Sequence, residues 1–172
     1  ERSRAGLFLS FQYPAEIDGV TVGSFLRMAV NAHLDKPLRI SEFKRELHKN
    51  MQLLNIPQDF ATRYLNKGFS GGEKKKMEIL QLLMIKPRVA ILDETDSGLD
   101  IDALRVVSES IKEAKRFLPD MAVLVITHYQ RILQYLHPDR VLVLSQGTIV
   151  KEGKHELVGL IEKEGFEQFV HE

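Results

Sequence analysis

The first third of the chain contains one short continuous apolar run and two stretches in which apolar residues recur periodically, and these patterns predict different elements. Residues 7–11 form a short apolar run that is followed by a proline, which predicts a buried strand ending there. Apolar side chains then recur every three or four positions over 24–34 and over 41–54, so we expect two amphipathic helices. With a further short helix near 60–65, this stretch is predicted to be helical, and a loop through Gly19 joins it to the strand.

From residue 71 onward, strand patterns and helix patterns alternate. Apolar strand-like runs occupy 89–92 and 122–126, and helical spacing occupies 71–85 and 103–118. Because a helix between two strands returns the chain to the same end of a sheet, the alternation predicts a parallel, doubly wound α/β sheet.

The last part of the chain predicts a hairpin and two helices. Strands over 141–144 and 148–151 are separated by Ser-Gln-Gly, a turn signal, and helical segments are expected near 154–163 and 165–171. No apolar run approaches the roughly 20 residues that span a bilayer, and no signal-peptide pattern opens the chain. We therefore expect no direct membrane insertion.

The charge balance and the cysteine count narrow the classes of partner. Lysine and arginine together number 24 against 24 acidic residues, so no overall attraction to nucleic acid or to an anionic membrane is expected. Cysteine is absent, which excludes disulfides, thiolate metal ligands and a cysteine nucleophile. These features predict a soluble cytoplasmic protein without a nucleic-acid partner.

The stretch Ser70-Gly71-Gly72-Glu73 stands where the helix over 71–85 is predicted to begin. A serine followed three residues later by a glutamate is a capping box, and two glycines remove side chains that would keep a ligand from the first exposed N–H groups. Such a helix N-terminus is an anion site. The same residues could serve only to start a helix, and the lysines that follow fit either a phosphate or a solvated helix face.

Polar side chains follow the predicted strands at their carboxyl ends, where open α/β sheets bind ligands. Asp93 and Glu94 end the stretch V-A-I-L-D-E; an aspartate there suits Mg²⁺, held through water, and a glutamate suits an attacking water. His128 follows the next strand and could reach a γ-phosphate, while Gln12 follows the first strand and could sense a metal or a water. An acidic turn and a surface histidine remain alternatives, and helix capping alone would explain Asp100.

The order of these motifs resembles that of the ATP-binding cassette (ABC) ATPases over essentially the whole chain. Gln12 matches the Q-loop, residues 69–73 the signature motif, 89–94 the Walker B strand, 97–100 the D-loop and His128 the switch histidine. The resemblance implies a P-loop NTPase core of the α/β class, with a parallel sheet and an inserted helical subdomain.

The resemblance also divides the chain. Residues 1–20 match the Q-loop region, 21–86 the helical subdomain with the signature motif, and 87–172 the Walker B, D-loop, H-loop and C-terminal part of the core. The family's P-loop, G-x-x-x-x-G-K-[ST], lies several tens of residues before the Q-loop, whereas eleven residues precede Gln12 here. We therefore expect an N-terminally incomplete copy, without the Walker A strands, that binds ATP poorly by itself and is inactive or very weakly active.

The resemblance assigns roles to the motif residues. Two copies would sandwich two Mg-ATP molecules head to tail, with residues 70–73 of one copy capping the γ-phosphate held by the other and Asp100 linking the two sites. Around that nucleotide the resemblance implies that Glu94 is the general base and that His128 contacts the γ-phosphate. It places Asp93 and Gln12 near the Mg²⁺ ion. The implied cofactors are ATP and Mg²⁺.

Within the family, four stretches look like SufC, the ATPase subunit of the Suf iron–sulfur cluster assembly scaffold. Transporter subunits usually carry L-S-G-G-Q followed by Q-R and a P-T-S-A-L-D stretch, but this chain has FSGGEKKKMEILQ, DETDSGLDIDAL and THYQRILQYLHPD, together with FQYPAEIDGV. This branch implies SufB-like and SufD-like partners that hold the cluster. The absence of cysteine fits a motor that is not itself the thiolate scaffold.

Two other functions remain open. A nucleotide-binding subunit of an ABC transporter would share the motifs and need a membrane partner, although the E-K-K-K and T-D-S-G-L-D variants speak against it. The chain as written could also be a non-catalytic interaction module that docks a partner through its helical stretch and Q-loop.

Overall fold

The computed structural model describes residues 1–129 and 131–166, which divide into two units at residue 127. The first unit, Glu1–Thr127, carries the helical region and a parallel sheet. The second unit begins at His128 and carries a hairpin with two helices. Within the described part of the chain, no helix is both long enough and apolar enough to cross a membrane.

A three-stranded parallel sheet forms the centre of the first unit. Its order is β1 (Leu7–Ser10), β4 (Val89–Asp93) and β5 (Ala122–Ile126), with Ser10 opposite Leu92 and Asp93 opposite Ile126. The strands predicted over these residues are confirmed. Because parallel strands share a direction, the residues that follow them gather at one edge of the sheet.

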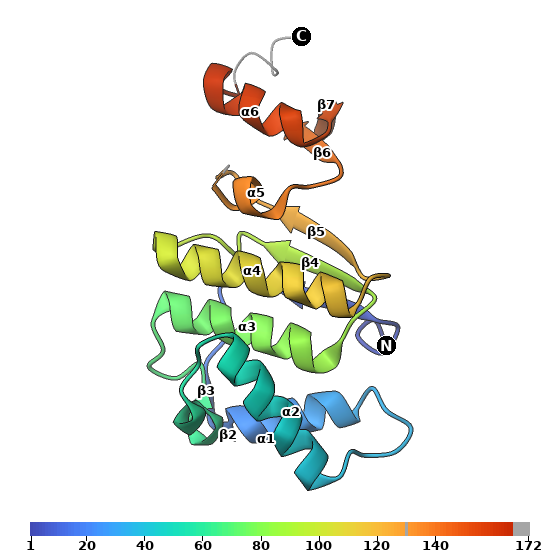
Figure 1. The fold of residues 1–172 in the computed structure, drawn as a ribbon, viewed down its shortest axis with the longest axis vertical. Helices are drawn as coiled ribbons and strands as arrows, with labels where there is room; N and C mark the ends of the chain where they lie inside the picture. The colour runs from blue at the N-terminus through green and yellow to red at the C-terminus, as the bar shows by residue number, and fades with distance from the viewer. Residues whose placement is uncertain (130, 167–172) are drawn as a thin grey trace. The chain divides into compact units, whose positions relative to one another are not determined.

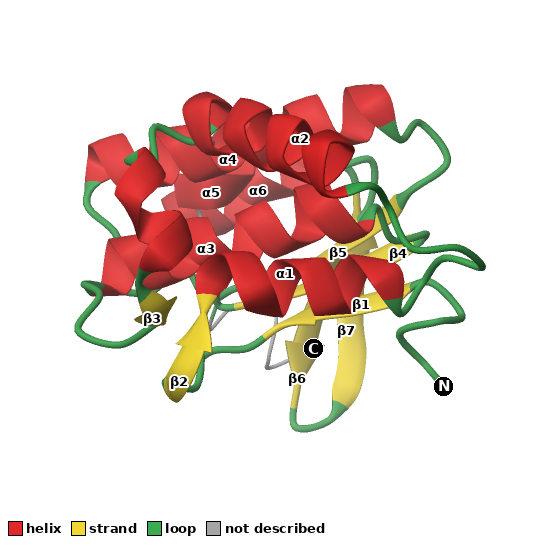
Figure 2. Cartoon of the chain, turned by 90° about the horizontal axis from the view of Figure 1, so that it is seen from below, coloured by secondary structure: helices red, strands yellow, loops and turns green. Residues whose placement is uncertain are grey.

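Two long helices cover one face of this sheet. They are α3 (Gly71–Ile85) and α4 (Ile101–Phe117), which lie side by side in Figure 1 and above the strands in Figure 2. Phe8, Ala90 and Leu92 point to the covered face and are buried, whereas Leu9 and Val89 are 41% and 38% exposed. The described helices of this unit therefore leave the second face of the sheet open.

The helical region between β1 and α3 differs from the prediction in two places. Its elements are β2 (Ile17–Thr21), α1 (Val22–Asn31), α2 (Ile40–Leu53), the 3-10 helix η1 (Gln58–Thr62) and β3 (Tyr64–Leu65). The predicted loop through Gly19 contains a strand, and the helix predicted over 60–65 is wrong in its second half. Both errors have one cause, since β2 and β3 pair with each other across more than forty residues, a contact that local periodicity does not encode.

The second unit is a hairpin with helices packed on it. Strands β6 (Val141–Ser145) and β7 (Thr148–Gly153) pair antiparallel, α5 (Arg131–Leu136) precedes them and α6 (His155–Glu164) follows. The predicted hairpin and first helix are confirmed, while α5 was missed. Of the helix predicted over 165–171, residues 167–171 lie outside the described residues and the first two are not helical.

Candidate nucleotide-binding site

The predicted capping box at the start of α3 is confirmed. The Glu73 N–H donates to Ser70 Oγ at 3.3 Å, and the Ser70 N–H donates to a Glu73 carboxylate oxygen at 2.7 Å. The N–H groups of Gly71 and Gly72, in the first turn, have no acceptor within an α-helix. They remain the donors that a phosphate could take.

Packing within the chain does not require the two glycines. A Cβ atom built on Gly71 would lie 3.9 Å from the carbonyl oxygen of Gly98, and one on Gly72 would lie 3.8 Å from side chains of Leu99 and Ala103. These are ordinary van der Waals distances. The missing side chains therefore leave room at a helix N-terminus that lies beside the loop around residue 98, as expected if a ligand approaches this backbone.

The lysines after the signature motif have separate roles. Lys74 forms an ion pair with Glu16 at 2.7 Å, and Lys75 is buried and binds inside the chain. Neither sequence interpretation, a phosphate cluster or a solvated face, describes Lys75. The sequence does not predict the burial of Lys75, because three consecutive lysines are identical and nothing local distinguishes the buried one from its neighbours.

The carboxyl edge of the sheet brings two predicted site residues together. The Gln12 Nε2 amide donates to Glu94 Oε2 at 2.5 Å, although 82 positions separate these residues in the sequence. Glu94 follows the end of β4, where its N–H donates to the Ile126 carbonyl at 2.9 Å. Its φ angle is +44°, a left-handed conformation that is uncommon for a residue other than glycine and occurs often at functional sites.

Asp93 is the last residue of β4 and directly precedes Glu94 in the sequence. It is partly buried. With one Gln12 amide nitrogen bound to Glu94, the amide oxygen and the Asp93 carboxylate are the oxygen donors that Mg²⁺ prefers. No cluster of three or more His, Cys, Asp or Glu residues that could hold a metal occurs among the described residues. This donor set fits a Mg²⁺ ion that takes most of its ligands from water and nucleotide phosphates.

Asp100 and Asp96 lie in the loop between β4 and α4. Asp100 caps α4, accepting the Ala103 N–H at 2.7 Å, as the sequence predicted. Asp96 was not predicted to matter, yet it is 7% exposed and accepts the Thr127 hydroxyl at 2.7 Å. This bond joins the loop to the end of β5, one residue before His128.

His128 begins the second unit, where its ring lies against that of Tyr129 with centroids 3.9 Å apart. Its role on the γ-phosphate stays a prediction. The first unit thus brings together Gln12 and Glu94, and sets Gly71 and Gly72 beside the loop that leads to Asp100.

Residues 1–97, more than half of the chain, match the family model described as ABC transporter. The chain belongs to this family. Among curated relatives of the cassette, Vegetative protein 296 of Bacillus subtilis is 53% identical over 169 residues, covering 97% of this chain and 64% of that protein. A probable ABC transporter ATP-binding protein of Streptococcus pyogenes is 50% identical over 168 residues, covering 96% of this chain and 65% of the relative. The chain therefore spans just under two thirds of the length of these relatives.

Solved structures show that the fold is that of an ABC cassette. A dimeric structure of MJ0796, a bacterial ABC transporter cassette, has a TM-score of 0.77 at 18% identity and covers 90% of this chain and 65% of that chain. The predicted fold class, a mixed α/β cassette with a parallel sheet, is confirmed by this similarity.

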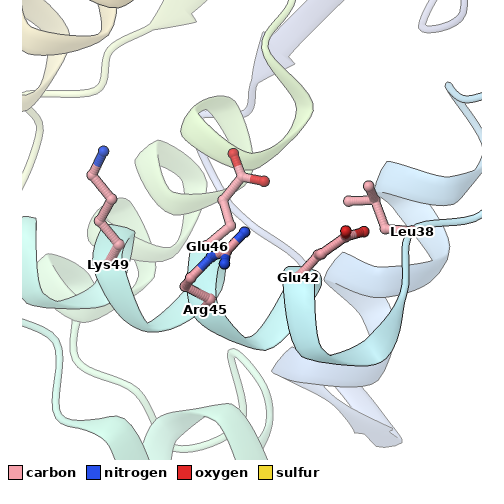
Figure 3. A pocket seen from close by; sticks show the side chains of 5 residues that line it. All are labelled: Leu38, Glu42, Arg45, Glu46 and Lys49. Carbon is pink, nitrogen blue, oxygen red and sulfur yellow. The ribbon is translucent and has the colours of Figure 1, made fainter.

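One surface hollow of the cassette lies away from these motifs. Its volume is about 400 Å³. Figure 3 shows side chains of both charges around it, most of them on α2. The lining residues are Leu38, Glu42, Arg45, Glu46 and Lys49. None of them was predicted to touch a nucleotide, and the mixed charges suit no phosphate.

Proposed function

We propose that this chain forms part of an ATP-hydrolysing ABC subunit, in which Glu94 activates the attacking water. The observation that carries the proposal is the bond between Gln12 and Glu94 at the carboxyl edge of the parallel sheet. Open α/β sheets bind ligands at this edge, and a carboxylate there can orient a water for in-line attack on a phosphorus atom. The left-handed backbone of Glu94 fits a side chain held for a purpose other than packing.

The remaining predicted residues have roles that follow from their chemistry. Asp93 and the Gln12 amide oxygen would face the Mg²⁺ ion that accompanies ATP, and His128 would donate to the γ-phosphate. When bound, Mg²⁺ neutralises charge on the phosphates. The Gln12 amide donates to Glu94 and so fixes the direction in which that carboxylate points.

The signature residues would serve the nucleotide of a second copy of the cassette. The free N–H groups of Gly71 and Gly72, with the Ser70 hydroxyl, form an anion site at the N-terminus of α3. This site alone contributes only about 0.3 to 1 kcal/mol to anion binding, so it completes a phosphate site rather than making one. The related MJ0796 cassette is dimeric, which supports a pair of copies. We propose that this pair is head to tail, with Asp100 between the two sites.

Two uses of the ATP energy are proposed. The names of the relatives, which include a probable ATP-dependent transporter of Synechocystis that is 48% identical over 171 residues, favour a subunit of a membrane transporter. The second candidate is a SufC-type motor for iron–sulfur assembly on SufB-like and SufD-like subunits, favoured by the E-K-K-K and T-D-S-G-L-D stretches. Co-purification separates them, because the first requires a membrane protein and the second requires soluble scaffold subunits that carry cysteine.

The hydrolysis proposal is tested with this chain carrying a family P-loop segment upstream. We expect Mg-dependent ATP hydrolysis that Glu94→Gln lowers at least about 100-fold, because the amide cannot accept the water's proton. The matched control is Glu109→Gln, which removes an exposed carboxylate on α4 and should leave the rate unchanged. Equal rates for Glu94→Gln and the parent would contradict the proposal.

A further inference from the structure

An ion pair lies buried inside the first unit, next to the predicted site but outside it. Lys75 Nζ lies 3.1 Å from Glu78 Oε2, and the two side chains are 5% and 4% exposed. Both residues belong to α3, one turn apart. Two charges removed from water at this depth need an explanation beyond simple packing.

The pair binds both backbone polar groups of a single residue, Phe11. Lys75 Nζ donates to the Phe11 carbonyl oxygen at 2.7 Å, and the Phe11 N–H donates to Glu78 Oε1 at 2.7 Å. Phe11 directly follows the end of β1 and directly precedes Gln12. The peptide groups that lead into Gln12 are therefore held by side chains of α3.

The same carboxylate is also connected to the segment after β4 that carries Glu94. Glu78 Oε2 accepts the hydroxyl of the fully buried Ser10 at 2.8 Å, and Ser10 Oγ lies 3.4 Å from Thr95 Oγ1. Thr95 is buried and directly follows Glu94. One buried network thus touches the chain beside both partners of the Gln12–Glu94 bond.

Stability alone is a poor account of this arrangement. Buried ion pairs are often replaced by apolar residues of similar volume without loss of stability, because desolvation of the two charges offsets their attraction. A buried network in which every polar group is hydrogen-bonded instead holds its partners in one arrangement. Here it holds the two peptide groups of Phe11, which directly precedes Gln12.

We propose that Lys75 and Glu78 are positioning residues that hold Gln12 against Glu94 and so set the rate of ATP hydrolysis without touching the nucleotide. This inference rests on the proposed function. A catalytic group displaced by about 1 Å can lose about 100-fold in rate, so the effect should appear in kcat and leave nucleotide affinity nearly unchanged.

The test replaces both charges at once, since removing one partner would leave the other charge buried and unpaired. In the chain with an upstream P-loop segment, the double variant Lys75→Met/Glu78→Leu is compared with Glu109→Leu/Lys112→Met, which removes an exposed pair at the same i, i+3 spacing on α4. We expect kcat to fall about 10- to 100-fold in the first variant with KM for ATP within about threefold, and no change in the second.

A second readout does not depend on activity. Hydrogen exchange at the Phe11 amide, measured on the chain itself, should become at least about tenfold faster in the first double variant, because that N–H loses its acceptor on Glu78. The exchange of α4 amides should not change. Unchanged Phe11 exchange would overturn the inference.

The outcomes separate this inference from the proposed function. Wild-type kcat in the double variant, with Glu94→Gln inactive, overturns the inference and leaves the proposed function standing. A loss of rate that only follows the unfolded fraction shows a structural pair and also overturns the inference. If Glu94→Gln is fully active, the proposed function fails and the positioning role fails with it.

Discussion

At the scale of single residues, the site depends on a few side chains whose chemistry was visible in the sequence. Gln12, Glu94 and Ser70 are predictable site residues because each stands at a strand end or a helix start, where ligands bind. The structure brings the first two into contact and confirms the capping role of the third. Lys75 and Glu78 are not predictable in this way, because burial of a charged side chain has no local sequence signal.

A substitution at Ser70 separates its two roles. Ser70→Ala should destabilise the protein by about 1 kcal/mol, since the cap of α3 is lost, and should also lower ATP hydrolysis of the chain with an upstream P-loop segment. The matched control is Thr21→Ala, which removes the side-chain cap of α1 at similar cost but lies outside the proposed site. Thermal melts and ATPase assays on both variants check this. Equal activities in the two variants would show that Ser70 acts only as a cap.

At the scale of elements, each segment was predictable where its pattern is local and long. The helices α3 and α4 and the strands β4 and β5 were predicted within two residues of their observed ends, because apolar periodicity and caps lie within each segment. The strands β2 and β3 were missed because I-D-G-V-T contains no continuous apolar run and two residues cannot show a period, so both depend on pairing with each other.

The hairpin of the second unit depends on one glycine. Gly147 has φ of +81°, and Gln146 beside it has φ of +47°, which is the conformation of a tight turn with two left-handed residues. Gly147→Ala should destabilise this unit by about 1 kcal/mol, since alanine is strained there even though the space is open. Gly159→Ala is the matched control, because Gly159 lies inside α6 with nothing near a built Cβ, and alanine there should stabilise by about 0.5 to 1 kcal/mol. Native-state hydrogen exchange of the β6 and β7 amides measures both changes, and the same sign in both would contradict this account.

At the scale of the whole molecule, the chain carries the signature, Walker B and D-loop motifs but no G-x-x-x-x-G-K-[ST] pattern. Within the described part of the first unit, the helices cover one face of the parallel sheet and leave Leu9 and Val89 on the other face exposed, although parallel sheets are normally covered on both faces. Family membership was predictable from the ordered motifs, since these are short local patterns. The function of the whole protein was not predictable, because it depends on surfaces and partners.

Titration of Mg-ATP tests the prediction that the chain binds ATP poorly without a P-loop. The chain as written should bind with a dissociation constant above about 1 mM, because that affinity requires about 4 kcal/mol and a helix N-terminus supplies at most about 1. The same chain with a family P-loop segment upstream should bind at least about tenfold more tightly. Calorimetry on both versions gives the comparison. Equal binding would mean that residues other than a P-loop hold the nucleotide.

The sequence by itself determined the order of elements, the helix caps and which residue types stand at the strand ends, because each of these depends on neighbours within a few positions. Only the tertiary structure decided that Gln12 meets Glu94 across 82 positions and that Lys75 and Glu78 are buried and bind the backbone of Phe11. The reason is physical. Burial and long-range hydrogen bonds depend on which faces pack together, and that choice is made by the whole chain when its sheet and helices assemble.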